Sequence, residues 1–380
     1  TNSASRPAHS AHPMATAGCG SVSDSVRGYP LRAFVICLIA YTTAQMDLAL
    51  FGYAVPAIRA EFGLTLSEVM AIVSTAFLLG GALLVLLGWL ADRLGRLPLF
   101  QFSLLGSSFL VALISIAPGV ATLTALRGAS IAVGGLSYPI TGAIITEEMP
   151  ARLRGLFMGL LQIGYPLGWA LASLWSMWLL TEYGWRQLFW VGLVSLPMVW
   201  VVRRYLREPP RSVAARSTEA PPRFSDLFAS GIRERAITLF VAQFLFVWAY
   251  AASIFLFPSF LREVRSLDAF NFSLLIGAGN AIGVLGYVLA AWIGERVWTR
   301  RNTVVLWTLL GAMLFQVLVW VPTTFGQILF VYALMSMFFY GSAAVKFAYL
   351  AEVFPTRIRA LAMACCGSLA VTMGSAAGPY

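Results

Sequence analysis

The sequence predicts an all-α membrane protein whose transmembrane helices form two bundles. Its 380 residues are 59% hydrophobic and 11% charged, and its mean hydropathy is +0.80. Soluble domains carry roughly 25% charged residues. The arginines flank long apolar runs instead of clustering on a polar domain, so the net charge of +10 does not indicate nucleic-acid binding. These observations exclude a soluble globular protein and favour a polytopic protein of the lipid bilayer.

Apolar runs long enough to cross a bilayer predict the order of the helices. Eleven spans are expected, at about 31–55, 69–91, 97–117, 120–146, 155–180, 187–206, 236–260, 271–294, 303–321, 325–350 and 360–380. A stretch rich in proline and arginine separates the first six spans from the remaining five. The predicted parts are a disordered cytoplasmic tail (1–30), an N-terminal six-helix bundle (31–206), a cytoplasmic linker (207–235) and a C-terminal bundle (236–380). The C-terminal bundle requires one more span after Tyr380, so we expect the sequence to be truncated there.

The distribution of arginine predicts the orientation of the chain. If the N-terminus is cytoplasmic, the outer loops hold only Arg59, Arg186, Arg262 and Arg265. Cytoplasmic loops of membrane proteins carry the excess of basic residues. The N-terminus is therefore predicted to be cytoplasmic, in a multi-pass protein that is most simply placed in a bacterial inner membrane as a monomer.

Two motifs recur at nearly the same offset and predict an internal repeat. Aligning Asp92 with Glu295 gives an offset of 203 residues, and aligning Glu148 with Glu352 gives 204. Two halves that share sequence and topology form a parallel repeat of helix bundles.

The segment Gly88-Trp-Leu-Ala-Asp92-Arg93-Leu-Gly95-Arg96 lies between the second and third predicted spans. It resembles the loop 2–3 signature of the major facilitator superfamily. That resemblance implies a conformational gate, in which these charges pair across the bundles in one state and separate in another. The gate residues implied are Gly88, Asp92, Arg93, Gly95, Arg96, Glu148, Arg154, Glu352 and Arg359. The alternative is that these charges only set the topology.

A finer resemblance points to the aromatic acid:proton symporters and the metabolite:proton symporters of that superfamily. It rests on Asp47 with Gly52 and Pro56 in the first span, and on Arg127 with Gly134, Gly135 and Pro139 in the fourth. Gly184-Trp185-Arg186 and Glu208-Pro-Pro-Arg211 also fit that pattern. Ala44 departs from it, because many members have a second acid at that position.

Asp47 is the carboxylate that falls in the middle of a predicted span, about 20 Å along a helix from Arg32 at ~1.5 Å per residue. A charge at that depth costs several kcal/mol, ~3 by the lower estimates. An acid that favours its protonated form in the membrane, yet ionises when water reaches it, is suited to proton coupling. We therefore predict that Asp47 carries protons and that Arg127 is its partner. A neutral or ion-paired structural Asp47, and an Arg127 that extends to the outer interface, are the alternatives.

Lys346 is the sole lysine of the chain and lies ~9 Å from the inner end of the tenth predicted span. It is a candidate for binding a substrate carboxylate, and the alternative is that it extends to the inner interface. Other candidates for lining the cavity are Gln162, Tyr165, Gln243, Trp248, Tyr250, Asn280 and Tyr340, each of which could instead serve packing. At the repeat offset Asp47 corresponds to Tyr250 and Arg127 to Phe330. This pairing predicts proton binding in the first half and substrate recognition mainly in the second.

No cofactor or metal site is predicted, and an enzyme is not expected. Both histidines, His9 and His12, lie in the N-terminal tail, and neither a CxxC pair nor a GxxxxGK[ST] loop occurs. The predicted function is proton-coupled uptake of a small organic acid or related metabolite by alternating access. Efflux of drugs or metabolites, a sugar or polyol porter, and a membrane receptor that does not transport are the alternatives.

Overall fold

The computed structural model describes residues 28–94, 96–150, 153–208, 224–253, 257–354 and 362–378. Throughout these ranges the chain is helical, with short turns between the helices and no strand. The all-α fold predicted from the apolar runs is therefore confirmed. The expected tail, apart from residues 28–30, and the central part of the expected linker lie outside the described residues. So do the predicted gate residues Gly95 and Arg359.

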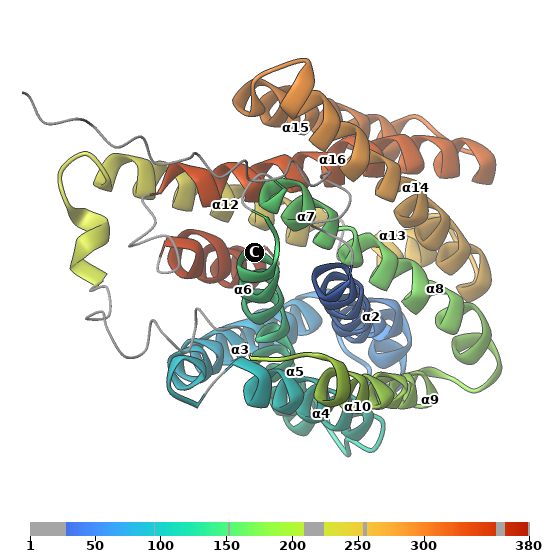
Figure 1. The fold of residues 1–380 in the computed structure, drawn as a ribbon. Coiled ribbons are helices and arrows are strands. Elements are labelled where there is room, and N and C mark those ends of the chain that lie inside the picture. Colours follow the sequence, from blue (N-terminus) through green and yellow to red (C-terminus); the bar gives the residue numbers. More distant parts are fainter. Residues whose placement is uncertain are drawn as a thin grey trace, which may run out of the picture.

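The first half of the chain contains long helices separated by tight turns (Figure 1). They are α2 (Tyr29–Phe62), α3 (Leu66–Leu94), α4 (Arg96–Ile114), α5 (Val120–Gly135), α6 (Ser137–Glu148), α7 (Arg154–Leu161), α8 (Gly164–Glu182), α9 (Trp185–Leu188), the 3-10 segment η1 (Phe189–Ser195) and α10 (Leu196–Tyr205). Helix α5 continues into α6 after Leu136, and α9, η1 and α10 form one continuous span.

The second half has a similar sequence of helices. They are η2 (Phe224–Phe228), α12 (Arg233–Ser253), α13 (Phe257–Glu263), α14 (Ala269–Arg296), α15 (Arg300–Trp320), α16 (Phe325–Val353), the π-helical η3 (Met363–Leu369) and α18 (Ala370–Ala377).

The ends of several helices follow from local sequence. Pro30 lies in the first turn of α2, where a missing N–H costs nothing, and Gly63 ends that helix with a left-handed φ of 62°. At the start of α16, Thr324 and Gln327 form a reciprocal capping box.

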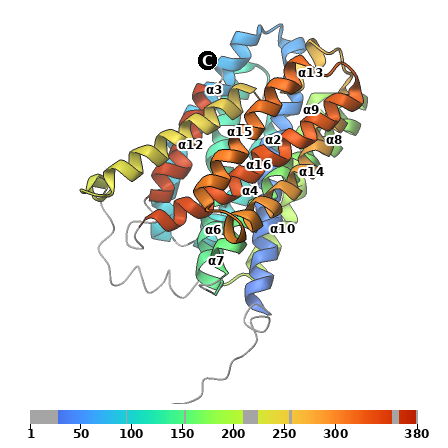
Figure 2. The same cartoon turned by 90° about the horizontal axis from the view of Figure 1, so that it is seen from above.

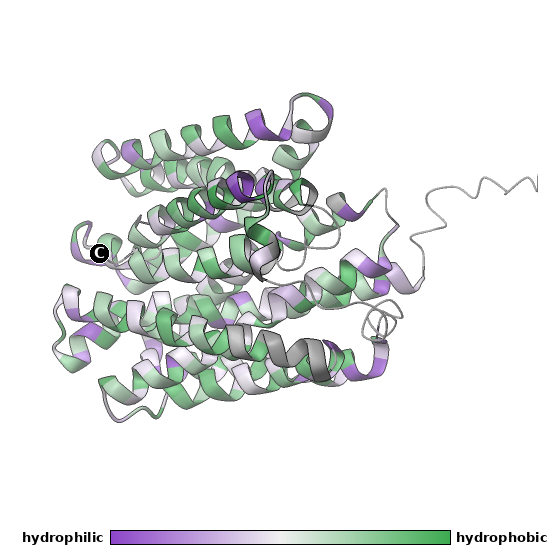
Figure 3. Cartoon of the chain, turned by 90° about the vertical axis from the view of Figure 1, so that its left-hand side faces the viewer, coloured by the Kyte–Doolittle hydropathy of each residue, from purple (hydrophilic) through white to green (hydrophobic). Residues whose placement is uncertain are grey.

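Within the described residues, ten helical segments are long and apolar enough to cross a membrane, some of them made of two or three consecutive elements, and residues 365–377 form a shorter apolar helix. Ten of the eleven predicted spans thus reappear at full length, and the last reappears as η3 and α18. Large apolar side chains such as Leu78, Phe109, Trp200 and Met313 are exposed on the outer faces of the helices. Figure 3 shows apolar residues distributed along the whole length of the helices. Such a surface is suited to lipid, and the chain is an integral membrane protein.

The two halves pack directly against each other through α8 with α14 and through α3 with α18. Glycines allow these close approaches. A methyl group added at Gly277 of α14 would overlap the Ser173 side chain of α8, and one added at Gly81 of α3 would overlap Thr372 of α18. These contacts place the facing helices of both halves around a shared central space.

Candidate functional site

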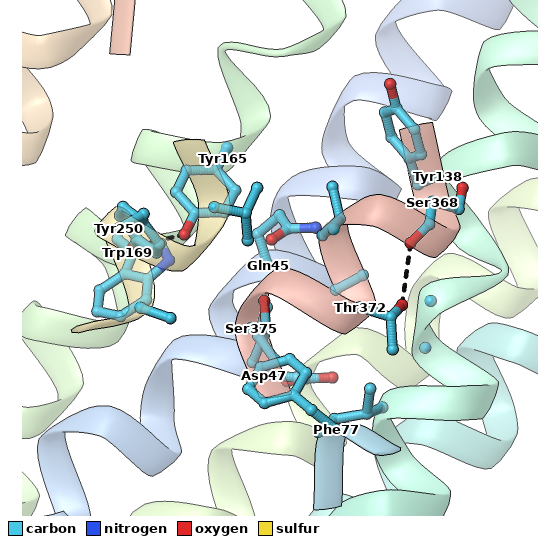
Figure 4. Close-up of a pocket in the computed structure, with 18 of the residues that line it drawn as sticks. Gln45, Asp47, Phe77, Tyr138, Tyr165, Trp169, Tyr250, Ser368, Thr372 and Ser375 are labelled. Atoms are coloured by element: carbon cyan, nitrogen blue, oxygen red, sulfur yellow. Dashed lines mark hydrogen bonds between the residues drawn. The ribbon is translucent and has the colours of Figure 1, made fainter. Parts of the chain in front are cut away.

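A cavity of about 260 Å³ lies between the two halves (Figure 4). Its wall is mostly apolar and comes from both halves, with α2, α5 and α8 on one side and α12, α16 and α18 on the other. The polar and aromatic lining residues include Tyr41, Gln45, Asp47, Arg127, Tyr138, Gln162, Tyr165, Trp169, Gln243, Phe246, Tyr250, Tyr287, Phe339 and Tyr340. A mostly apolar space with a few polar groups is the usual form of a small-molecule site.

Asp47 lines this cavity from the middle of α2 and is 3% exposed. Its Oδ2 atom accepts a long hydrogen bond of 3.5 Å from Ser195 Oγ. Its Oδ1 atom has no hydrogen-bond partner among the described residues. The carboxyl group identified from the sequence is therefore buried at the cavity, with one oxygen that makes no hydrogen bond within the described residues.

Arg127, on α5, also lines the cavity and is 2% exposed, so it does not extend to the membrane interface. One guanidinium nitrogen donates a 2.8 Å hydrogen bond to the carbonyl oxygen of Leu48, and Cζ lies 4.7 Å from the ring centroid of Phe51. Arg127 attracts the Asp47 carboxylate electrostatically while its hydrogen bond is to the adjacent backbone. The predicted partners are therefore neighbours, with the arginine held by the helix that carries the acid.

Tyrosines from both halves meet at the centre of the cavity. Tyr165 of α8 donates a 2.6 Å hydrogen bond to the phenolic oxygen of Tyr250 on α12, and Figure 4 shows these two side chains turned toward each other. The ring of Tyr340 lies 5.9 Å from that of Tyr165. These three candidates are all brought to the cavity, as expected from the sequence.

A column of stacked rings extends from these tyrosines toward Lys346. Tyr250 stacks on Phe339 at 5.8 Å, and Phe339 stacks on Phe246 at 4.6 Å between centroids. The Nζ atom of Lys346 lies 2.8 Å from the centroid of the Phe246 ring. Phe246 lines the cavity but Lys346 is not among the lining residues. Lys346 therefore does not line the cavity in this conformation, because the ring of Phe246 covers its ammonium group, and its binding of a substrate carboxylate stays a prediction.

Amide side chains from both halves supply further polar groups to the cavity. Gln162 accepts from Tyr41 at 3.4 Å and donates to Tyr138 at 3.2 Å. Gln243 of α12 also lines the cavity. Gln45 lines it with a buried oxygen that has no partner within the described part of the chain. The sequence analysis missed Gln45, although an amide two residues before Asp47 in an apolar span is a detectable signal.

Asn280 and Trp248 lie away from the cavity. Asn280 is fully buried and donates to Ile276 O at 2.8 Å and to Tyr332 at 3.4 Å. Trp248 is 41% exposed, and its indole N–H donates to Ala377 O at 3.0 Å. Neither lines the cavity. The candidates were wrong for this conformation because helical position alone does not show which face a neighbouring helix covers.

Phe330, the predicted counterpart of Arg127, is 69% exposed and points away from the cavity. Phe330 therefore does not occupy a place in the cavity wall like that of Arg127. The first half also contributes Tyr41, Gln45 and Gln162 to the wall. Polar lining residues thus come from both halves, and substrate recognition mainly by the second half stays a prediction.

At the end of the bundle where α2 begins, an ion pair and charged hydrogen bonds connect helices of the first half. Arg96 forms an ion pair with Glu147 of α6. The carboxylate of Glu208 accepts from the backbone N–H groups of Arg96 and Leu97, at 2.9 and 3.0 Å. This carboxylate caps the N-terminus of α4, where unpaired N–H groups favour negative charge. Arg154 donates to Met149 O at 3.0 Å.

Other predicted gate residues are placed only in part. Gly88, Asp92 and Arg93 lie on α3, Glu148 ends α6, and Glu352 lies near the end of α16. The side chains of Asp92, Arg93 and Glu352 are outside the described structure. Arg96 pairs with Glu147, a residue that the sequence analysis did not single out, within one half of the chain.

An ion pair joins the two halves at the opposite end of the bundle. Arg59 of α2 pairs with Glu263 at the end of α13. In Figure 2 the start of α2 lies at the bottom and α13 lies at the top, so this pair is remote from Arg96. Within the described residues there is no group of three side chains that could hold a metal ion.

Comparison with known proteins gives three kinds of match. A sequence model of the Major Facilitator Superfamily matches residues 37–379. The chain is 27% identical over 344 residues to the cis,cis-muconate transport protein of Acinetobacter baylyi, covering 87% of this chain and 82% of that protein. It is 27% identical over 358 residues to the niacin transporter NiaP of the same organism, covering 83% and 78%. It is 25% identical over 350 residues to the gentisate transporter of Corynebacterium glutamicum, covering 89% and 77%.

Solved structures share the fold at lower sequence identity. A bacterial homologue of the lysosomal transporter Spinster, inward-facing and occupied, has a TM-score of 0.71 at 16% identity, with 92% of this chain and 80% of that chain covered. A D-xylose-proton symporter has a TM-score of 0.71 at 16% identity, with 92% and 88% covered.

Proposed function

Because this chain belongs to the major facilitator superfamily, we propose that it is a secondary transporter that takes up a small organic acid together with protons. The observation that carries the proposal is Asp47, a buried carboxyl group at a cavity between two halves. A protein that only binds a ligand would gain nothing from the cost of burying this acid.

The proton would bind Asp47 when the cavity is open to the outside and leave it when the cavity is open to the cytoplasm. Burial opposes the ionised carboxylate, whereas Arg127 on the neighbouring helix attracts it. Because the two effects oppose each other, a change in water access between the two states can shift the balance. Each proton moving inward is driven by ~2.3 kcal/mol per 100 mV of membrane potential.

The substrate class is inferred from the wall of the cavity and from the relatives. The names of the three curated relatives refer to muconate, niacin and gentisate, all small organic acids. Tyr165, Tyr250 and Tyr340 offer flat apolar faces together with hydroxyl groups, and Gln162 offers an amide. Such walls suit a planar molecule with a polar edge. Lys346 would reach a substrate carboxylate only after the ring of Phe246 moves aside.

Alternating access would proceed by rocking of the two halves around this cavity. The proposed gate residues are Gly88, Asp92, Arg93, Gly95, Arg96, Glu148, Arg154, Glu352 and Arg359. We further propose that the end of the bundle where α2 begins is cytoplasmic in a bacterial inner membrane, and that a single chain performs the transport.

The experiment is uptake into proteoliposomes that contain the purified full chain, with an imposed pH gradient and labelled muconate, nicotinate and gentisate as probes. We expect inward accumulation of at least one acid that collapses when a protonophore removes the gradient. Asp47→Asn should abolish this accumulation but retain exchange of labelled for unlabelled substrate. Glu182→Gln changes an exposed acid at the end of α8 and should behave as wild type.

Two results would contradict the proposal. Gradient-driven uptake by Asp47→Asn at the wild-type level would remove Asp47 from proton coupling. Accumulation only when the gradient favours outward movement of the acid would identify an exporter instead.

A further inference from the structure

A chain of hydroxyl groups leads away from Asp47 into the first half, on the side away from α12 and α16. Ser195, the last residue of η1, has its Oγ 3.5 Å from Asp47 Oδ2 and 2.6 Å from Ser108 Oγ of α4. Ser195 and Ser108 are 1% and 0% exposed. We propose that Ser195, held in place by Ser108, is the positioning residue that sets the balance between protonated and ionised Asp47. This inference rests on the proton-coupling role proposed for Asp47.

The hydroxyl hydrogens of Ser195 and Ser108 have more than one possible acceptor. Each hydroxyl group has one hydrogen to donate. Ser195 can donate to Gly192 O at 2.6 Å, to Ser108 at 2.6 Å or to Asp47 at 3.5 Å. Ser108 can donate to Leu104 O at 2.7 Å or to Ser195. The heavy atoms therefore permit two complete arrangements of the hydrogens.

In the first arrangement Asp47 is ionised. Ser195 donates its hydrogen to the carboxylate, and Ser108 donates to the oxygen of Ser195. In the second arrangement Asp47 is protonated and donates its O–H to Ser195. Ser195 then donates its hydrogen to Ser108, and Ser108 donates to the carbonyl oxygen of Leu104. The direction of the serine pair thus reverses with the protonation state of Asp47, while the proton itself exchanges between Asp47 and water in the cavity.

The position of Ser195 is fixed by the helix that carries it. Segment η1 is a 3-10 stretch within the sixth span, between α9 and α10. Gly192 lets this stretch lie against α4, because a methyl group there would press on Val111. Mid-span 3-10 segments are common at functional hinges. The Ser195 hydroxyl group therefore links Asp47 of α2 to the end of the 3-10 stretch in the sixth span.

The charged groups that face Asp47 are few. Arg127 of α5 is the other Asp, Glu, Lys or Arg among the cavity-lining residues of the described structure. The ammonium group of Lys346 lies behind the Phe246 ring. Arg127 acts on Asp47 through space, and Ser195 acts by direct contact. Replacing Ser195 therefore removes a donor to the carboxylate while the charge of Arg127 stays in place.

The chain provides a matched control on the same helix. Ser103 of α4 lies 2.9 Å from Ser137 Oγ and donates to Val133 O at 2.6 Å. Ser103 and Ser137 are 0% and 1% exposed. The hydrogen bonds of this second buried serine pair go to each other and to Val133 O, so its loss tests for a general effect of removing a hydroxyl group from the bundle.

The experiment is a pH titration of the full chain in liposomes by infrared difference spectroscopy, which requires no substrate. The band to follow is the carbonyl stretch of protonated Asp47, assigned by its loss in Asp47→Asn. Removing a donor to the ionised form disfavours ionisation. We therefore expect the titration midpoint to rise by about one pH unit in Ser195→Ala. Ser195→Thr, which keeps a hydroxyl group, should return the midpoint close to wild type.

The remaining variants decide between specific and general effects. Ser108→Ala should raise the midpoint in the same direction by a smaller amount, because it frees Ser195 to turn toward Gly192. Ser137→Ala should titrate as wild type. A wild-type midpoint in both Ser195→Ala and Ser108→Ala would overturn the inference, and so would an equal shift in Ser137→Ala. If Ser195→Ala does not fold, Ser108→Ala and Ser195→Thr carry the same comparison.

The titration and the uptake assay test the role of Ser195 and the proposed transport function independently. A midpoint that shifts in Ser195→Ala while the wild type shows no gradient-driven uptake would contradict the proposed function but support the positioning role. Normal proton-driven uptake that is lost in Asp47→Asn, with an unchanged midpoint in Ser195→Ala, would contradict only the role of Ser195.

Discussion

Tyr165 donates a 2.6 Å hydrogen bond to Tyr250, and this bond joins the two halves of the molecule inside the cavity. Both phenols belong to helices that line the same space, α8 and α12. Since Tyr250 accepts the hydrogen of Tyr165, its own hydroxyl hydrogen remains available to another acceptor. A carboxylate in the cavity would be such an acceptor.

Replacing Tyr250 with phenylalanine should therefore weaken substrate binding more than replacing Tyr165. We expect Tyr250→Phe to raise the KM for the transported acid about 10-fold and Tyr165→Phe about 3-fold, with expression unchanged. Initial rates of uptake measure both effects. Tyr183→Phe, at an exposed tyrosine beyond the end of α8, is the control. A larger effect at Tyr165 than at Tyr250 would contradict this assignment.

Gly277 is predicted to be essential for the packing of α8 on α14. In Gly277→Ala the new methyl group meets the side chain of Ser173, and overpacking of this kind costs ~1–3 kcal/mol. We expect a lower thermal midpoint in detergent and slower transport. Gly326→Ala, which adds a methyl group in open space at the start of α16, should change neither quantity.

A second substitution tests whether the clash with Ser173 is the cause. Combining Gly277→Ala with Ser173→Gly removes the overlapping atoms and should restore much of the lost stability. Additive losses in the double variant would show that Gly277 acts through backbone flexibility instead.

The ion pair of Arg59 and Glu263 should favour the conformation described here over one in which that end opens. Both groups are partly exposed, so the pair is worth only ~0–1 kcal/mol. We expect Glu263→Gln to increase labelling of a cysteine placed at Gln45 by a membrane-impermeant thiol reagent added from that side. The exchange of Arg59→Glu with Glu263→Arg should return labelling toward wild type. Equal labelling in all variants would show that the pair does not affect opening.

Lys346 provides a test of anion recognition behind the Phe246 ring. If the ring moves aside for a carboxylate, Lys346→Met should weaken binding of the acid by about 10-fold or more, because a hydrogen bond to a charged group is lost. Binding of the corresponding neutral amide should be unaffected. Competition of each compound against labelled substrate measures both affinities. Unchanged affinity for the acid would restrict Lys346 to packing on Phe246.

The sequence predicted the fold class and the buried Asp47 because each rests on a strong one-dimensional signal. Span length follows from bilayer thickness, and an acid in an apolar run is conspicuous. The errors have a common cause. Neighbouring residues in a helix point about 100° apart, so Glu147 and Glu148 face different surroundings, and only packing shows that Arg96 meets Glu147.

Lys346 and Asn280 show that the sequence also does not reveal whether a polar side chain faces the cavity. Both are polar residues in apolar spans, and the sequence treated them as equivalent to Tyr250 and Gln162. In the structure a single ring separates Lys346 from the cavity, and Asn280 turns its amide toward its own helix and Tyr332. Whether a polar side chain faces a cavity depends on the neighbouring helix, and sequence periodicity does not contain that information.

The carboxylate that caps α4 belongs to Glu208, at the point where the chain leaves α10. If the chain is split and its two parts are expressed as separate fragments, the break should therefore lie after Glu208. A first fragment that ends at Leu206 would leave the first backbone N–H groups of α4 without their acceptor and should assemble poorly. One that ends a few residues beyond Glu208 would keep the cap. Glu208 also limits where a fluorescent tag can be inserted. An insertion before Glu208 would separate this residue from α10 and remove the cap from α4, which is the third span.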